Sequence, residues 1–81
     1  MKRLEILCFD FAKDPISGKR LLKVRAVVLP NNDCSSDQLA YEIRSSLFQR
    51  SGLYFIGEWR TMFRSNIGDS YCFAEIFYQI S

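Results

Sequence analysis

Apolar and polar residues alternate along two segments in the first third of the chain. Residues 21–29 alternate cleanly, which is typical of a half-buried strand. Residues 3–11 are also β-prone, but they carry apolar residues on both sides. Pro15 and Gly18 lie between the two segments, and both residue types favour a turn. The pattern predicts a β-hairpin that ends at residues 30–33.

A helical pattern follows this hairpin. Ser35 or Ser36 can cap the helix, and Ser35 with Gln38 three positions later fits a capping box. Gly52 is suited to end the helix, because glycine adopts the left-handed conformation that closes many helices. One apolar stripe at helical spacing is the expected core face: Leu39, Ala40, Ile43 and Leu47.

Two further extended segments, residues 54–63 and 71–80, complete the chain, and most of its aromatic residues lie on them. The polar, glycine-containing connector at residues 64–70 predicts a second hairpin. The element order is therefore ββαββ, in a single domain that covers residues 1–81.

This order predicts an α+β fold of two layers, with one helix packed on a four-stranded sheet. Two arrangements fit the pattern. The sheet is either β-grasp-like, with the last strand parallel beside the first, or an antiparallel sandwich. Segments 3–11 and 71–80 are expected in central positions, because they are the most apolar.

A single helix covers one face of the sheet, and the side of each strand with fewer charges is predicted to lie beneath it. Small residues on that side would let the helix approach closely. The side so assigned contains Leu4, Ile6 and Cys8; Leu22, Val24, Ala26 and Val28; Phe55, Gly57, Trp59, Thr61 and Phe63; and Cys72, Ala74, Ile76, Tyr78 and Ile80.

The opposite side keeps aromatic and apolar residues among its charges. Apolar patches larger than roughly 300–600 Å² usually mark a site that something covers. The chain's own loops or tails are one possible cover, and a partner is the other. The predicted partner-binding residues are Phe9, Phe11, Arg25, Tyr54, Arg60, Met62, Tyr71, Phe73 and Phe77.

Charge and cysteine content narrow the class of protein. The net charge is only +2, whereas proteins that bind the nucleic acid backbone are usually far more basic. The chain has no run of eighteen apolar residues that could span a membrane, and Glu5 and Asp10 interrupt the N-terminal stretch that a signal peptide would need. Cys8, Cys34 and Cys72 are odd in number and widely spaced, which indicates reduced thiols in a cytoplasmic protein.

The sequence offers little catalytic chemistry. Histidine is absent, which removes the commonest general base and the commonest metal ligand. The carboxylates show no pairing typical of acid–base catalysis, and the cysteines do not have zinc-site spacing. We therefore expect no enzyme activity, no cofactor and no metal.

Together these patterns predict a small non-enzymatic protein-binding module, such as an adaptor, an inhibitor or an immunity-type factor. The helix-free aromatic face would be its contact surface, and homodimerisation through that face is one form of the hypothesis. The alternative is a module for single-stranded nucleic acid, in which the aromatic side chains stack on bases and Lys23, Arg25 and Arg60 hold phosphates. Glu5, Glu58 and Glu75 share the predicted face and favour the protein partner.

Overall fold

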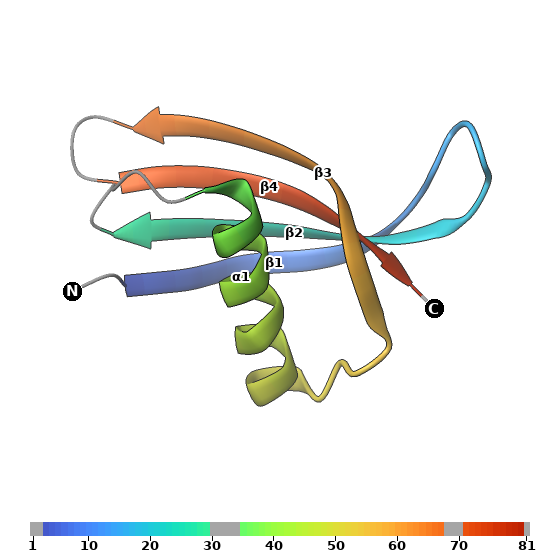
Figure 1. The fold of residues 1–81 in the computed structure, drawn as a ribbon, viewed down its shortest axis with the longest axis horizontal. Helices are drawn as coiled ribbons and strands as arrows, with labels where there is room; N and C mark the ends of the chain where they lie inside the picture. Colours follow the sequence, from blue (N-terminus) through green and yellow to red (C-terminus); the bar gives the residue numbers. More distant parts are fainter. Residues whose placement is uncertain (1–2, 30–34, 68–70, 81) are drawn as a thin grey trace.

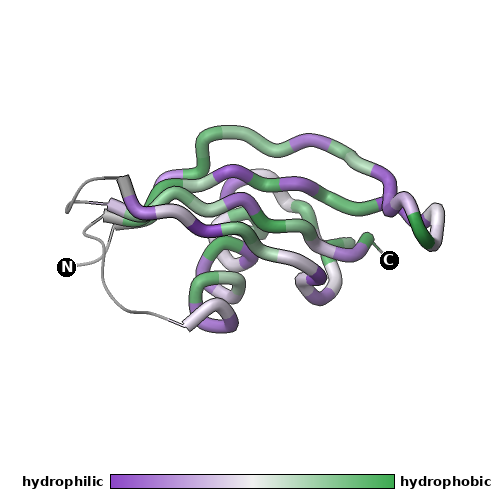
Figure 2. The backbone as a smooth tube through the Cα atoms, turned by 90° about the horizontal axis from the view of Figure 1, so that it is seen from above, coloured by the Kyte–Doolittle hydropathy of each residue, from purple (hydrophilic) through white to green (hydrophobic). Residues whose placement is uncertain are grey.

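The computed structural model describes residues 3–29, 35–67 and 71–80. They form a hairpin of β1 (Arg3–Lys13) and β2 (Arg20–Leu29), a helix α1 (Ser36–Ser51), and a second hairpin of β3 (Ile56–Ile67) and β4 (Tyr71–Ile80). The helix lies across one side of the sheet, and no described segment lies on the other side (Figures 1 and 2). The predicted two-layer ββαββ fold is confirmed.

The four strands lie in the order β1-β2-β4-β3, and every neighbouring pair is antiparallel. Of the two predicted arrangements, the antiparallel one is therefore correct. The β-grasp-like alternative is wrong, because β4 lies between β2 and β3 and not parallel beside β1. The expected central position of β4 is confirmed, but β1 is an edge strand. None of the helices in the described ranges is both long and apolar enough to cross a membrane.

The helix begins and ends as its sequence predicts. The Ser35 side chain accepts a hydrogen bond of 3.1 Å from the Gln38 backbone N–H, which satisfies one of the free donors of the first turn. Gly52 adopts φ 63°, and its N–H donates to the Phe48 carbonyl at 3.2 Å. Both terminal signals in the sequence are thus used.

The core lies between the helix and the two central strands. Burial alternates strictly along the first eight residues of β4, and the same alternation runs from Leu22 to Val28 in β2. All four residues of the predicted helical stripe are buried against these strands. The buried cluster consists of Leu22, Val24, Ala26, Val28, Leu39, Ala40, Ile43, Leu47, Ile56, Ala74, Ile76 and Tyr78.

Strand β1 contains one extra residue at Leu7, where its pairing with β2 shifts by one position. A bulge of this kind exchanges the two sides of a strand beyond it. Cys8 therefore points away from the helix, while Phe9 and Phe11 lie on the helix side, where both remain about half exposed. The expectations that Cys8 is a core residue and that Phe9 and Phe11 lie on the helix-free side are wrong. The pairs that fix this register are Ile6–Ala26, Cys8–Arg25, Phe9–Val24 and Phe11–Leu22.

Strand β3 contains two such irregularities, one on each side of Trp59. Because opposed residues in antiparallel strands point to the same side, Met62 packs against the core, whereas Thr61 and Phe63 lie on the helix-free side. All three were expected on the opposite side. Ile56, also expected away from the helix, is buried in the core. The pairs that fix this register are Ile56–Ile80, Trp59–Tyr78, Thr61–Phe77, Met62–Ile76 and Phe63–Glu75.

The residues before β3 also differ from the expectation. Tyr54 and Phe55 form a turn and not the start of the strand. Tyr54 stacks on Phe48 at the end of the helix, with 5.5 Å between ring centroids, so it lies on the helix side. Phe55 is 38% exposed and does not belong to the core.

The second connector is shorter than predicted, because β3 continues to Ile67 and includes most of the expected loop. The remainder of that loop lies outside the described residues. So do the end of the first hairpin at residues 30–33 and the expected thiol at Cys34.

Candidate functional site

We use the term open face for the side of the sheet that α1 does not cover. It continues across all four strands, and its middle two rows come from the central strands β2 and β4. Figure 2 shows hydrophobic and hydrophilic positions alternating along these strands. The open face consists of Glu5, Cys8 and Asp10; Leu21, Lys23, Arg25 and Val27; Tyr71, Phe73, Glu75, Phe77 and Gln79; and Thr61, Phe63 and Ser65.

Of the nine predicted site residues, Arg25, Tyr71, Phe73 and Phe77 lie together on the open face. Arg60, at the bulge of β3, joins them by donating a hydrogen bond of 3.3 Å to the side-chain oxygen of Gln79. The other four predicted site residues, which the structure does not bring to this face, are Phe9, Phe11, Tyr54 and Met62.

Sequence reasoning missed two apolar residues of the open face. Phe63 was assigned to the core, yet it is 60% exposed beside Phe77. Leu21 begins the clean alternation of β2 and could have been found from that parity, because it precedes Lys23 and Arg25 by two and four positions. For Phe63 the sequence gives no comparable signal, since the bulges of β3 decide its side.

The charges at the centre of the open face neutralise one another. Arg25 Nε donates to Glu75 Oε2 at 3.0 Å, and Lys23 Nζ lies 3.8 Å from the same oxygen. Asp10 lies opposite Lys23 in the register, and Glu5 lies one strand width from Val27 on the same side. Both cations at the centre of the open face thus have a carboxylate neighbour.

One end of the open face is hollowed by a groove of about 400 Å³ between the β1–β2 turn and strand β3. The Phe63 and Phe77 rings meet edge to face at its base, with centroids 6.4 Å apart and planes at 86°. We call this depression the hairpin groove. Its lining residues are Lys13, Asp14, Pro15, Ile16, Leu21, Arg60, Thr61, Phe63 and Phe77.

Hydrogen bonds within the turn shape the wall of the hairpin groove. Asp14 accepts from the Ile16 backbone N–H at 2.9 Å and from the Ser17 hydroxyl at 3.0 Å. These two bonds hold the pKa of the Asp14 carboxyl below its ordinary value of 3.8, and the positive charge of Arg60 adds a smaller lowering. Gly18 closes the turn with φ 73°, a conformation that favours glycine. Ile16 stands at the tip, fully exposed.

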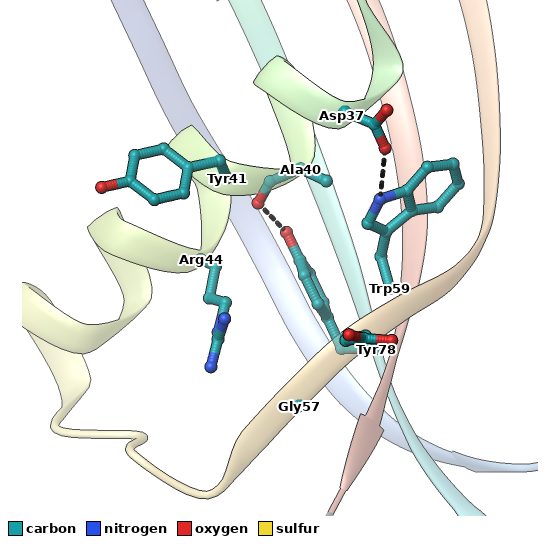
Figure 3. A pocket seen from close by; sticks show the side chains of 8 residues that line it. Asp37, Ala40, Tyr41, Arg44, Gly57, Trp59 and Tyr78 are labelled. Atoms are coloured by element: carbon teal, nitrogen blue, oxygen red, sulfur yellow. Dashed lines mark hydrogen bonds between the residues drawn. The ribbon is translucent and has the colours of Figure 1, made fainter.

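The helix side has a second cavity, of about 380 Å³, between α1 and β3 (Figure 3). Its polar groups bind one another across the two layers. Trp59 Nε1 donates to Asp37 Oδ1 at 3.1 Å, and the buried Tyr78 hydroxyl donates to the Ala40 carbonyl. Burial raises the pKa of the Tyr78 phenol above its ordinary value of 10.0.

Arg44 completes this cavity by joining the helix to the start of β3. Its Nη2 donates to the Ile56 carbonyl at 2.9 Å, and its guanidinium lies 5.0 Å from the centroid of the Phe48 ring. Its Nε is buried and has no hydrogen-bond partner in the described part of the chain. We call the three hydrogen bonds that Arg44, Trp59 and Tyr78 make between the two layers the clamp.

Within the described ranges, no three His, Cys, Asp or Glu side chains gather where they could hold a metal ion. The thiols of Cys8 and Cys72 are free, and they lie on opposite sides of the sheet, Cys8 exposed and Cys72 buried. Comparisons with protein-family models, with curated proteins and with solved structures find no match.

Proposed function

We propose that this protein is a small non-enzymatic binding module that contacts a protein partner through its open face. The observation that carries the proposal is the row of aromatic side chains along β4. Phe73 and Phe77 remain partly exposed although they sit on a central strand, and the Phe63 ring lies beside them more than half exposed. Aromatic residues with few unpaired charges are the composition of a protein-binding surface.

The pairing of both cations at the centre of the open face with Glu75 favours a protein over a nucleic acid. A nucleic acid partner needs cations that remain available to phosphates, but Glu75 already binds both Lys23 and Arg25. The aromatic rings are also supported from below by a rigid sheet, which limits the entropy lost on binding. An adaptor or inhibitor role in a reducing compartment such as the cytoplasm is consistent with the unpaired thiols of Cys8 and Cys72.

Site-specific photo-crosslinking tests the proposal. Phe63 is replaced by the photoreactive residue benzoylphenylalanine, and the matched control carries the same replacement at Phe11. Both are strand phenylalanines with similar exposure, 60% and 52%, on opposite sides of the sheet. After irradiation in the cells that make the protein, we expect a discrete, protease-sensitive adduct from position 63 and none from position 11.

Two outcomes would overturn the proposal: a nuclease-sensitive adduct from position 63, which indicates nucleic acid, or equal labelling from both positions.

The mass of the adduct also tests for a second copy of the chain. If the partner is another copy, light scattering of the purified protein gives twice the mass of 9.5 kDa. The double variant Phe73→Ser, Phe77→Ser should then be a folded monomer. If the double variant unfolds instead, the two rings serve the fold and not the partner.

A further inference from the structure

We infer that the hairpin groove accepts an apolar side chain of the partner together with a carboxylate that follows or precedes it in the partner's chain. The inference rests on the proposed function and deepens it, because it states the chemistry of the partner segment. The open face divides into two parts of different character. Its centre pairs two cations with carboxylates and has only a small depression of about 100 Å³, whereas its cationic end contains the hairpin groove of about 400 Å³.

The shape of the groove suits one large apolar side chain. The edge-to-face contact of Phe63 and Phe77 leaves ring surface directed into a space of about 400 Å³. Leu21 adds to the base, while Pro15 and Ile16 form the opposite wall. Filling this space with an aromatic or leucine side chain removes apolar surface from water on both sides of the contact.

The charged residues of the groove indicate which group lies next to the apolar side chain in the partner. Lys13 and Arg60 line the groove with Asp14 as their one carboxylate. Both oxygens of Asp14 are engaged by the turn itself, through Ile16 and Ser17. Arg60 binds only the neutral amide oxygen of Gln79 among the described residues. An incoming carboxylate therefore meets a guanidinium with donors to spare, and bidentate pairing of the two groups is a strong form of hydrogen bond.

The centre of the open face does not offer the same chemistry. Arg25, the matching arginine at the centre of the open face, already donates to Glu75. The two arginines thus lie on one face, one hydrogen-bonded to a carboxylate and one to a neutral amide. This contrast provides a matched pair of variants, Arg60→Gln and Arg25→Gln, which remove the same charge from two parts of one surface.

The test is a titration of the ¹⁵N-labelled protein, followed by its amide resonances. The probe is a capped eight-residue peptide with a central phenylalanine flanked by two glutamates. Control peptides replace the glutamates with glutamines, or the phenylalanine with alanine, and a thymidine decanucleotide tests phosphate. Because the peptide is small and flexible, we expect weak binding, with a Kd of about 1 mM. The shifted amides should be those of Thr61, Phe63, Leu21 and the turn.

Arg60→Gln should weaken this binding about three- to fivefold, as for a partly exposed ion pair, while Arg25→Gln should leave it unchanged. Phe63→Ser should abolish it. The inference is overturned if the glutamate–phenylalanine peptide gives no shifts, or if both control peptides bind as tightly as that peptide. It is also overturned if the oligonucleotide binds in its place. These failures are distinct from failure of the proposed function. If the proposed function fails, the crosslink from position 63 is absent as well. A crosslink without peptide binding contradicts only the inference about the hairpin groove.

Discussion

The two sides of strand β4 have very different surroundings. On the helix side, Ile76 and Tyr78 are buried beneath α1, and the polar atoms of the clamp bond across the layers. On the open face, Phe73 and Phe77 are only partly covered. The helix side therefore stabilises the fold, while the open face carries aromatic surface that is not buried on folding. Mutations on the helix side should therefore lower stability, and mutations on the open face should weaken binding.

The largest effect is expected from a deletion in the core. Ile76 is fully buried between the helix and both neighbouring strands. Ile76→Ala should lower the free energy of unfolding by about 2–5 kcal/mol, since it removes apolar contact and leaves a cavity. Urea denaturation measures this loss. Ile76→Val, which removes one methylene, should cost only about 0.5–1.5 kcal/mol. Equal losses for the two variants would contradict the tight packing described for this side.

The next effect comes from the clamp. Tyr78→Phe removes the hydroxyl that donates to the Ala40 carbonyl but keeps the buried ring. We expect a loss of about 1–3 kcal/mol, the cost of breaking a buried hydrogen bond. Tyr71→Phe on the open face is the matched control and should change the free energy of unfolding by less than about 0.5 kcal/mol. A comparable loss from Tyr71→Phe would show that the open face also holds the fold.

Tyr78 also predicts a pH dependence. Because burial raises the pKa of its phenol, the folded state keeps this proton at pH values where the unfolded chain has lost it. The contribution to stability is complete below the ordinary pKa of 10.0 and is lost as the pH rises further. The free energy of unfolding, measured by denaturation at several pH values from 8 to 11, should therefore fall more steeply with pH for the native sequence than for Tyr78→Phe. Parallel slopes would argue against burial of this phenol.

The sequence was a good guide wherever a strand is regular. The clean alternation of β2 and the position of Glu75 and Gln79 on one side of β4 predicted the core sides of both central strands, and Ser35 and Gly52 predicted the ends of the helix. Central strands have neighbours on both sides, and β2 and β4 pair with each other without a register shift. In these strands periodicity alone is sufficient.

The edge strands could not be read in the same way, because bulges change which side a residue faces. In β1 a signal was present: Glu5 and Asp10 are five positions apart, and a regular strand would place them on opposite sides. The Leu7 bulge brings both to the open face. In β3 two irregularities around Trp59 displace Met62 and Phe63 from their expected sides. No charge pattern in the sequence indicates these irregularities.

A smaller effect on stability is expected for Phe63, although its effect on binding should be complete. Its ring contacts Phe77 edge to face and is otherwise exposed. Phe63→Ser should therefore cost about 0.5–1.5 kcal/mol for the lost aromatic pair, and less in total than Ile76→Ala. In the same protein, association with the partner should be lost. Phe11→Ser, on the helix side, should keep that association. A severe loss of stability in Phe63→Ser would place this ring in the core after all.

The smallest effect is expected at Cys8, whose reactivity nevertheless tests the bulge directly. Without the bulge, Cys8 would face the helix with Leu4 and Ile6, and both described thiols would be shielded. With the bulge, Cys8 is exposed while Cys72 is buried. In a Cys34→Ser background, iodoacetamide should label Cys8 at least about 100-fold faster than Cys72, which reacts only after local opening. Mass spectrometry of the digested protein gives both rates. Cys8→Ser should leave the free energy of unfolding within about 0.5 kcal/mol, and similar labelling rates would contradict the register assigned to β1.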